Sequence, residues 1–208
     1  MNAWQTLMDV LWSAGAVSVT SRCVTLASGR QSHVAVSLRH FVCQPANLNR
    51  LADVFGPWLA DGRPALCPVS SLLSPILSGA LAARFGLPLI LTRPLDADKG
   101  PAGQVCGRVG KGPIVLVDDI LAIDDTILAT ADLLTRHGAK DVSLFVFVDK
   151  RPITARKPFP LSVTAPIKLD ELLHYGIGTA RLTGEAVDWA EEELRFLEGE
   201  AETSQPES

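Results

Sequence analysis

The sequence predicts an α/β fold built around a parallel sheet, and three observations lead to this prediction. From residue 64 to residue 148, short apolar segments alternate with helical patterns, which is the order of right-handed βαβ units. The segments 87–92 and 114–117 are almost wholly apolar, as are strands buried on both faces of a parallel sheet. The 208 residues are 47% hydrophobic and 20% charged, which is enough for a large core in one domain.

The N-terminal segment predicts an amphipathic helix that packs against the core. Its large apolar side chains follow helical spacing: Trp4, Leu7, Met8, Leu11 and Trp12. No basic residue opens the segment and Asp9 interrupts it, so we do not expect a signal peptide. No apolar run reaches the roughly 18–20 residues of a membrane span, and we expect a cytoplasmic protein without membrane partners.

The elements that follow, up to residue 92, are predicted from hydrophobic period and from turn residues. Three short strands are expected at 17–20, 23–26 and 33–38, with a turn at Ser28-Gly29-Arg30. After them the pattern predicts a helix at 47–59, a strand at 64–68, a helix at 72–85 ended by Gly86, and the strand at 87–92.

The second half of the predicted sheet contains the candidate site. A long irregular stretch, 93–113, holds five glycines, and loops of this length inside a domain are usually functional. The strand at 114–117 leads into Asp118-Asp119, and a helix at 126–137 and a strand at 142–148 follow. Because ligands of open parallel sheets sit beyond the carboxyl ends of the strands, residues 118–126 are the expected site.

The charges are unevenly distributed along the chain. Residues 185–208 hold nine of the 23 acidic residues but only one of the 19 basic ones, Arg195. We expect an acidic amphipathic helix at 185–198 and a disordered tail at 199–208. The chain has no basic run and only 6% aromatic residues, so nucleic acid is not an expected partner.

The four cysteines lie far apart, without a CxxC pair or a histidine cluster: Cys23, Cys43, Cys67 and Cys106. This spacing predicts reduced, mostly buried thiols and argues against zinc ligands or disulfides.

Three segments carry a resemblance to a known family. The stretch Val115–Thr126 resembles the phosphoribosyl pyrophosphate (PRPP) motif of type I phosphoribosyltransferases, and a helix and His137-Gly138-Ala139 follow it. Val24–Ser32 is similar to the segment written FTLxSGRxS in orotate phosphoribosyltransferases. Asp149-Lys150 sits where that family has Asp-Arg. The order of elements agrees from about residue 7 to residue 175.

The resemblance implies a fold and a reaction. The fold is a central parallel sheet flanked by helices, within a domain at 1–184 whose small hood comes from about 15–40 and 160–176. The reaction joins a nucleobase to PRPP with Mg²⁺ and gives a nucleotide and pyrophosphate. Family active sites form across a dimer, which implies a homodimer here or a heteromer with an active paralogue.

The phosphate loop departs from the family pattern. Of its five positions, 122–126, only Thr126 fits, because Asp124 and Asp125 stand where the 5′-phosphate would lie. Like charges at about 4 Å repel by roughly 4 kcal/mol at an effective dielectric of 20. These carboxylates either cap the N–H groups of the following helix, or join Asp118 and Asp119 in a metal or amine site.

The mobile loop departs from the pattern as well. Arg93 and Gly100 match the family, whereas two lysines and a histidine are replaced by Pro94, Ala97 and Lys99. Two acids have also entered this loop, Asp96 and Asp98. Lys99 either meets an anion or is a solvated loop lysine.

Three further substrate positions are replaced. Ala27 stands where the family has a lysine, Val34-Ala35-Val36 replaces the aromatic residues that stack on the base, and Cys67–Leu72 lacks the lysine of the pyrophosphate turn. The serines of that turn cap the next helix or bind a ligand. The surviving ligand-binding candidates are Asp118, Asp119, Thr126, Arg93 and a cation at Lys150 or Arg151.

Two hypotheses follow from these losses. The first is a non-catalytic descendant of the family that keeps the fold for binding, regulation or assembly, because each lost charge contact costs about 10²–10³ in rate. The alternative is an active phosphoribosyltransferase that acts on orotate or a related base, with pyrophosphate held by Arg63, Arg108 or Lys111. In the acidic pair, Asp118 and Asp119 would bind ribose hydroxyls, or Asp119 would belong to a structural network.

Overall fold

The computed structural model describes residues 3–26, 29–60, 62–69, 71–93, 104–122, 125–156 and 159–199. A parallel sheet forms its centre, in the strand order β3-β6-β7-β8, with β9 also paired to β7. The strands are β3 (Ala65–Pro68), β6 (Ile114–Leu121), β7 (Val142–Asp149), β8 (Ser162–Thr164) and β9 (Ile167–Lys168). This arrangement is the predicted α/β fold.

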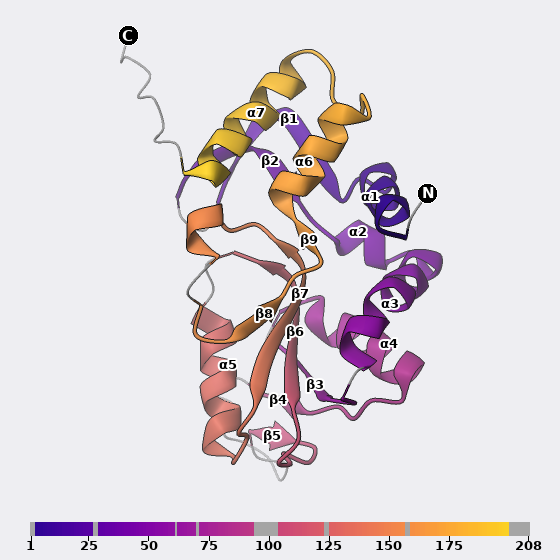
Figure 1. Ribbon diagram of the computed structural model, residues 1–208, viewed down its shortest axis with the longest axis vertical. Helices are drawn as coiled ribbons and strands as arrows, with labels where there is room; N and C mark the ends of the chain where they lie inside the picture. The colour runs from indigo at the N-terminus through magenta and orange to yellow at the C-terminus, as the bar shows by residue number, and fades with distance from the viewer. Residues whose placement is uncertain are drawn as a thin grey trace.

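Helices cover both faces of the sheet. Helices α3 (Pro45–Ala60) and α4 (Ser74–Phe85) lie on one side and α5 (Asp125–Arg136) lies on the other (Figure 1). Successive strand residues therefore face different cores: Phe145 and Phe147 pack with α3 and α4, whereas Leu144 and Val146 pack with α5. Burial on both faces explains why these strands are apolar without alternation.

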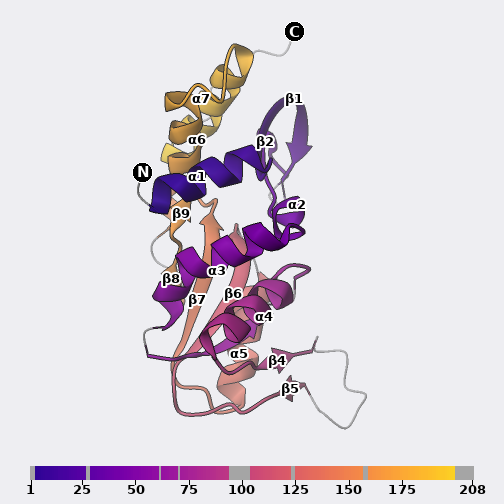
Figure 2. The same cartoon turned by 90° about the vertical axis from the view of Figure 1, so that its right-hand side faces the viewer.

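A smaller layer covers one end of the sheet. Here β1 (Val17–Thr25) and β2 (Gln31–Val36) form an antiparallel pair, which we call the hood. Helices α1 (Ala3–Ser13), α6 (Leu169–Gly178) and α7 (Glu185–Glu198) gather at the same end (Figure 2). A separate apolar cluster joins the hood to α6 and α7, through Val34, Leu169, Leu173, Leu182, Ala190, Leu194 and Leu197.

The predicted strand at 87–92 is wrong in its partner and its length. Only β4 (Leu91–Thr92) forms, and it pairs antiparallel with β5 (Val105–Cys106), inside the stretch predicted to be irregular. A single parallel bridge, Leu66 to Leu89, joins this segment to the main sheet. Pro88 has no N–H to continue a ladder, and Leu91 is 49% exposed.

Several boundaries also differ from prediction. Strand β6 continues through the acidic pair to Leu121, because its ladder with β7 runs on to Asp149. The two expected strands at 17–20 and 23–26 are one strand, β1, whose register is irregular between Val19 and Val24. Helix α6 and the short α2 (Arg39–Val42) were not predicted. Of the segment 160–176, expected in the hood, β8 and β9 belong to the central sheet.

The prediction of mostly buried cysteines is wrong. All four thiols are free, but Cys23 and Cys43 are exposed, Cys106 is half-buried and only Cys67 is buried. Burial raises the pKa of Cys67 to about 12. No helix in the described part of the chain is long and apolar enough to cross a membrane.

Candidate functional site

The acidic pair lies near the carboxyl end of β6, where the sequence predicted it. Asp118 is 2% exposed, and its Oδ1 atom accepts three hydrogen bonds. The donors are the Oγ atoms of Ser74 at 2.5 Å and Ser71 at 3.0 Å, and the Asp119 N–H at 2.9 Å. The carboxylate thereby ties the end of β6 to the start of α4.

Ser71 also has a second role at this junction. Its Oγ atom accepts the N–H of Ser74 at the first residue of α4, at 3.2 Å. The N-cap residue of α4 is Leu73, without a side-chain cap, so Ser71 satisfies one N–H at the helix start without being the N-cap itself. Ser70 lies outside the described residues.

Asp119 is half-buried and titrates unusually. Burial and the neighbouring Asp118 carboxylate raise the pKa of Asp119 to about 6. Both causes disfavour the charged form of the carboxyl group. The pair therefore concentrates negative charge at the end of β6, and a cation or a hydrogen-bond donor brought there would be stabilised.

Within the described residues, the acidic pair is not part of a larger group of possible metal ligands. Among the described residues, no group of three or more His, Cys, Asp or Glu side chains is placed to hold an ion. Mg²⁺ prefers six oxygen ligands and is often bound by one or two carboxylates plus water and substrate phosphate. With Oδ1 of Asp118 already accepting three hydrogen bonds, a bound Mg²⁺ would take most of its ligands from elsewhere.

The phosphate-loop prediction lies largely outside the described residues. Asp124 is not among the described residues, and Asp125 is described only as the first residue of α5, without its side chain. Thr126 is exposed in the first turn of α5, and its carbonyl accepts the Thr130 hydroxyl at 2.8 Å. The proposed capping by Asp124 and Asp125 stays a prediction.

The two predicted loop cations have different outcomes. Arg93 is exposed, and its N–H donates to the Gln104 carbonyl at 2.9 Å, which closes the β4–β5 pair. Within the described residues, no hydrogen bond or ion pair between Arg93 and Asp118 or Asp119 is found. Lys99 lies outside these residues.

Of the two cations after β7, only Lys150 is left for a ligand. Arg151 is 5% exposed and pairs with Asp149, with Nε at 3.0 Å and Nη2 at 2.8 Å from the two carboxylate oxygens. Lys150 donates its N–H to the Leu121 carbonyl at 2.8 Å, and its side chain is half-buried. Burial lowers the pKa of Lys150, and the Glu193 carboxylate partly opposes this effect.

A charged cluster between the hood and α7 was missed by the sequence analysis. The Arg30 guanidinium contacts Glu193 at 2.6 Å, and the Ser32 hydroxyl donates to the same carboxylate at 2.7 Å. A helical pattern could have revealed Glu193, because it shares a face with the buried Ala190 and Leu197. The partners, some 160 residues earlier, carry no such signal.

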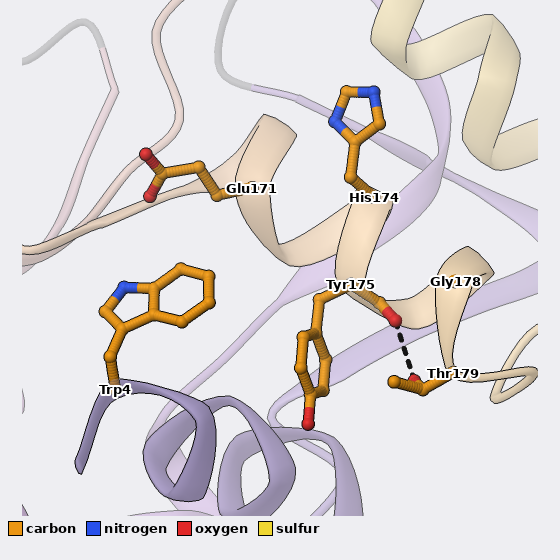
Figure 3. A pocket seen from close by; sticks show the side chains of 6 residues that line it. All are labelled: Trp4, Glu171, His174, Tyr175, Gly178 and Thr179. Atoms are coloured by element: carbon orange, nitrogen blue, oxygen red, sulfur yellow. Dashed lines mark hydrogen bonds between the residues drawn. The ribbon is translucent and has the colours of Figure 1, made fainter. Parts of the chain in front are cut away.

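The structure also contains a pocket away from the strand ends. It has a volume of about 450 Å³ and is lined by residues of α1 and α6 and the turn that follows (Figure 3): Trp4, Glu171, His174, Tyr175, Gly178 and Thr179. The hydroxyl of Tyr175, one of these lining residues, donates to Asp9 at 2.7 Å, and Arg181 pairs with Asp9 at 2.6 Å. None of the predicted site residues lines this pocket.

The fold is shared with phosphoribosyltransferases of known structure. The crystal structure of orotate phosphoribosyltransferase from Aeropyrum pernix superposes with a TM-score of 0.66 and 26% identity, over 83% of this chain and 98% of that one. UMP synthase of Leishmania donovani superposes with a TM-score of 0.73 and 21% identity, over 93% of this chain but 42% of the longer synthase. The chain thus has the type I phosphoribosyltransferase fold.

Sequence comparison indicates which phosphoribosyltransferases the chain resembles. The orotate phosphoribosyltransferase of Methanopyrus kandleri is 26% identical over 145 residues, which are 70% of this chain and 77% of that protein. The counterpart from Pyrococcus abyssi is 24% identical over 131 residues. No family model matches the chain. Within its fold class, the chain is related to the orotate phosphoribosyltransferases.

Proposed function

We propose that this chain is an orotate phosphoribosyltransferase-like protein with little or no transferase activity, and that it uses the fold for binding, regulation or assembly. The observation that carries the proposal is the hydrogen bonding and the burial of the Asp118 side chain. A carboxylate that binds ribose hydroxyls must offer free oxygen lone pairs to the ligand. One of the two oxygens of Asp118, Oδ1, already accepts from Ser71, Ser74 and the Asp119 N–H, and the residue is 2% exposed, so little of the carboxylate is open to a ribose.

The composition of the strand-end turn supports the same proposal. The turn at 67–72 contains no cation to hold pyrophosphate. Buried anions need preorganised positive partners, and the nearby negative charge of Asp118 and Asp119 opposes an anionic substrate. Val34, at a position where the resemblance implies an aromatic residue, is 1% exposed and packs in the cluster between the hood and α7.

An active enzyme is the second candidate, and two observations favour it. Asp119 and Lys150 are both only half-buried, and Lys150 directly follows β7 at the carboxyl edge of the sheet. These two groups would be the carboxylate and the cation that remain for a ribose and a base. In this case the chain would transfer the phosphoribosyl group from PRPP to orotate or a related base with Mg²⁺.

Turnover of orotate separates the two candidates. The purified chain is mixed with orotate, PRPP and Mg²⁺, and the loss of orotate is followed beside the Aeropyrum pernix enzyme as a positive control. Because each lost charge contact costs about 10²–10³ in rate, we expect turnover at least about 10⁴-fold below the control. Turnover within tenfold of the control would establish the second candidate.

The assembly role has its own test. We propose a homodimer as the basic state and, where an active paralogue exists, a heteromer with it in the cytoplasm. The tagged chain is isolated from its native cells, and the co-purifying proteins are identified by mass spectrometry. Recovery of a second phosphoribosyltransferase supports the heteromer, and recovery of the chain alone as a dimer supports the homodimer.

A further inference from the structure

The hood carries a cysteine and a histidine that the proposed function does not use. Cys23 of β1 is exposed. Its Sγ atom lies 3.3 Å from Nε2 and 3.7 Å from Nδ1 of His33 on the neighbouring strand β2. A thiol within hydrogen-bond reach of an imidazole is the arrangement in which a base activates a sulfur nucleophile. Neither residue is one of the predicted ligand-binding residues.

An irregularity in β1 brings the two side chains together. The register between β1 and β2 shifts between Val19 and Val24, so that four residues of β1, 20–23, stand opposite His33 alone. Extra residues in one strand form a bulge, which bends the strand and turns its side chains in new directions. This bulge presents its first and its last residue to the ring of His33.

The backbone carbonyl of Thr20 fixes the tautomer of His33. Nδ1 of His33 lies 2.8 Å from the Thr20 oxygen. Because a carbonyl only accepts hydrogen bonds, Nδ1 carries the proton of the neutral ring, and Nε2 is left as an acceptor. Nε2 is also the nitrogen closer to Sγ of Cys23. The nitrogen that faces the thiol is therefore the one that can take its proton.

Helix α7 holds the His33 ring in this orientation. The indole of Trp189 stacks on the imidazole, with ring centroids 4.7 Å apart and an angle of 11° between the two planes. An aromatic face also stabilises a cation placed over it, and His33 becomes a cation when it accepts the thiol proton. The sulfur nucleophile is exposed, its base lies beside it, and two groups orient the base.

We propose that Cys23 is a nucleophilic thiol activated by His33, and that it forms mixed disulfides with low-molecular-weight disulfides. Nε2 of His33 takes the thiol proton, and the Cys23 thiolate attacks one sulfur of the disulfide. A new S–S bond forms at Cys23 and the original S–S bond breaks. The other half leaves as a thiolate, which recovers the proton from His33, so Cys23 is oxidised and the leaving half is reduced. This modification site goes beyond the proposed function, because it involves no residue of the strand ends and no phosphoribosyl transfer.

Reaction of the chain with glutathione disulfide at neutral pH tests this proposal. The mixed disulfide at each cysteine is followed over time by mass spectrometry of the peptides. Cys43, at the end of α2, is the internal control because it is also exposed. We expect Cys23 to react at least about tenfold faster than Cys43, since a positioned base contributes roughly 10²–10⁴ in rate. Equal rates at the two cysteines would overturn the proposal.

His33→Gln separates activation by the base from simple exposure of the thiol. A glutamine side chain still donates hydrogen bonds but does not take up a proton at neutral pH. We expect Cys23 of this variant to react at least about tenfold more slowly than in the wild type, with Cys43 unchanged. His174→Gln, at an exposed position on α6, is the matched control and should leave both rates unchanged. If Cys23 reacts as fast in His33→Gln as in the wild type, the histidine does not activate it and the proposal fails.

A measurement on the wild type decides the case in which His33→Gln does not fold. Urea at a concentration that unfolds the chain separates Cys23 from His33 and exposes all thiols alike. We expect the ratio of the Cys23 rate to the Cys43 rate to fall from above about ten in the native chain to about one in urea. The same ratio in both states would contradict activation by the fold.

Discussion

Two buried carboxylates, Asp118 and Glu193, are held in opposite ways. Asp118 is paired with the hydroxyls of Ser71 and Ser74 and with a backbone N–H. Glu193 is paired with the guanidinium of Arg30 and the hydroxyl of Ser32. Within the described residues, Asp118 has no basic side chain among its hydrogen-bond partners, whereas Glu193 is paired with a cation.

The difference indicates where anions and cations can be accommodated. At the end of β6 the field is negative, which suits donors and cations and disfavours a phosphate. Between the hood and α7, Arg30 provides a positive charge, and Glu193 of the same chain neutralises it. Of these two places, the first disfavours an anion and the second holds its positive charge in an internal ion pair.

The largest effect is expected from Arg30→Ala. Removing the guanidinium leaves the Glu193 carboxylate, 4% exposed, without its ion pair. Breaking a buried pair in this way costs about 3–5 kcal/mol of unfolding free energy, which urea denaturation measures. A loss below about 1 kcal/mol would mean that the carboxylate is solvated, and would remove the contrast with Asp118.

Asp118→Ala is expected to have the next largest effect. It leaves two hydroxyls and one N–H without their acceptor, at a cost of about 2–3 kcal/mol. Asp118→Asn is the matched control, because its amide oxygen still accepts hydrogen bonds and should recover more than half of the loss. If both variants unfold at the same urea concentration as the wild type, the carboxylate does not hold the strand end to α4.

Asp119→Asn tests the negative charge at the end of β6 through the pH dependence of folding stability. The pKa of Asp119 is about 6 in the folded protein, above its ordinary value of 3.8, so the folded state loses stability as pH rises from about 4 to about 6. The variant should therefore be more stable than the wild type at pH 7.5, by about 1 kcal/mol after solvent screening. Below pH 4 the two should be equal.

Thermal melts at the two pH values measure this gain. Asp132→Asn, an exposed position on α5, controls for the substitution itself and should show no such difference. A gain that is the same at pH 4 and pH 7.5 would contradict the titration of Asp119.

Arg84→Ala should have the smallest effect and calibrates the others. Arg84 pairs with Asp53 at 2.7 Å, but both side chains are more than half exposed. Exposed pairs of this kind contribute about 0.2–1 kcal/mol, so we expect a loss of about 0.5 kcal/mol in the same urea assay. A loss as large as that of Arg30→Ala would show that burial does not separate the two pairs.

Much of the fold could be predicted because its signals are local. The helix α4 ends at Gly86, whose φ of 64° is the left-handed conformation that glycine adopts easily. The acidic pair follows a buried apolar strand, and the strand–helix order fixes its place at the sheet edge. The pairing of β4 could not be predicted, because the partner strand lies within a glycine-rich stretch that has no strand pattern.

The charged clusters could be predicted only in part, because their partners are distant in sequence. Asp118 was recognised, but nothing local indicated that Ser74, 44 residues earlier, would satisfy it. Arg30 and Glu193 are 163 residues apart. Lys150 could not be separated from Arg151 by sequence, since only the fold shows that Arg151 is engaged by Asp149.

Calorimetric titration of PRPP into the chain, with Mg²⁺ present, tests the central claim most directly. Because the strand-end site is negative and Oδ1 of Asp118 already accepts three hydrogen bonds, we predict no saturable heat and a Kd weaker than about 1 mM. A saturable isotherm with a micromolar Kd, abolished by Asp119→Asn or Lys150→Ala, would contradict it.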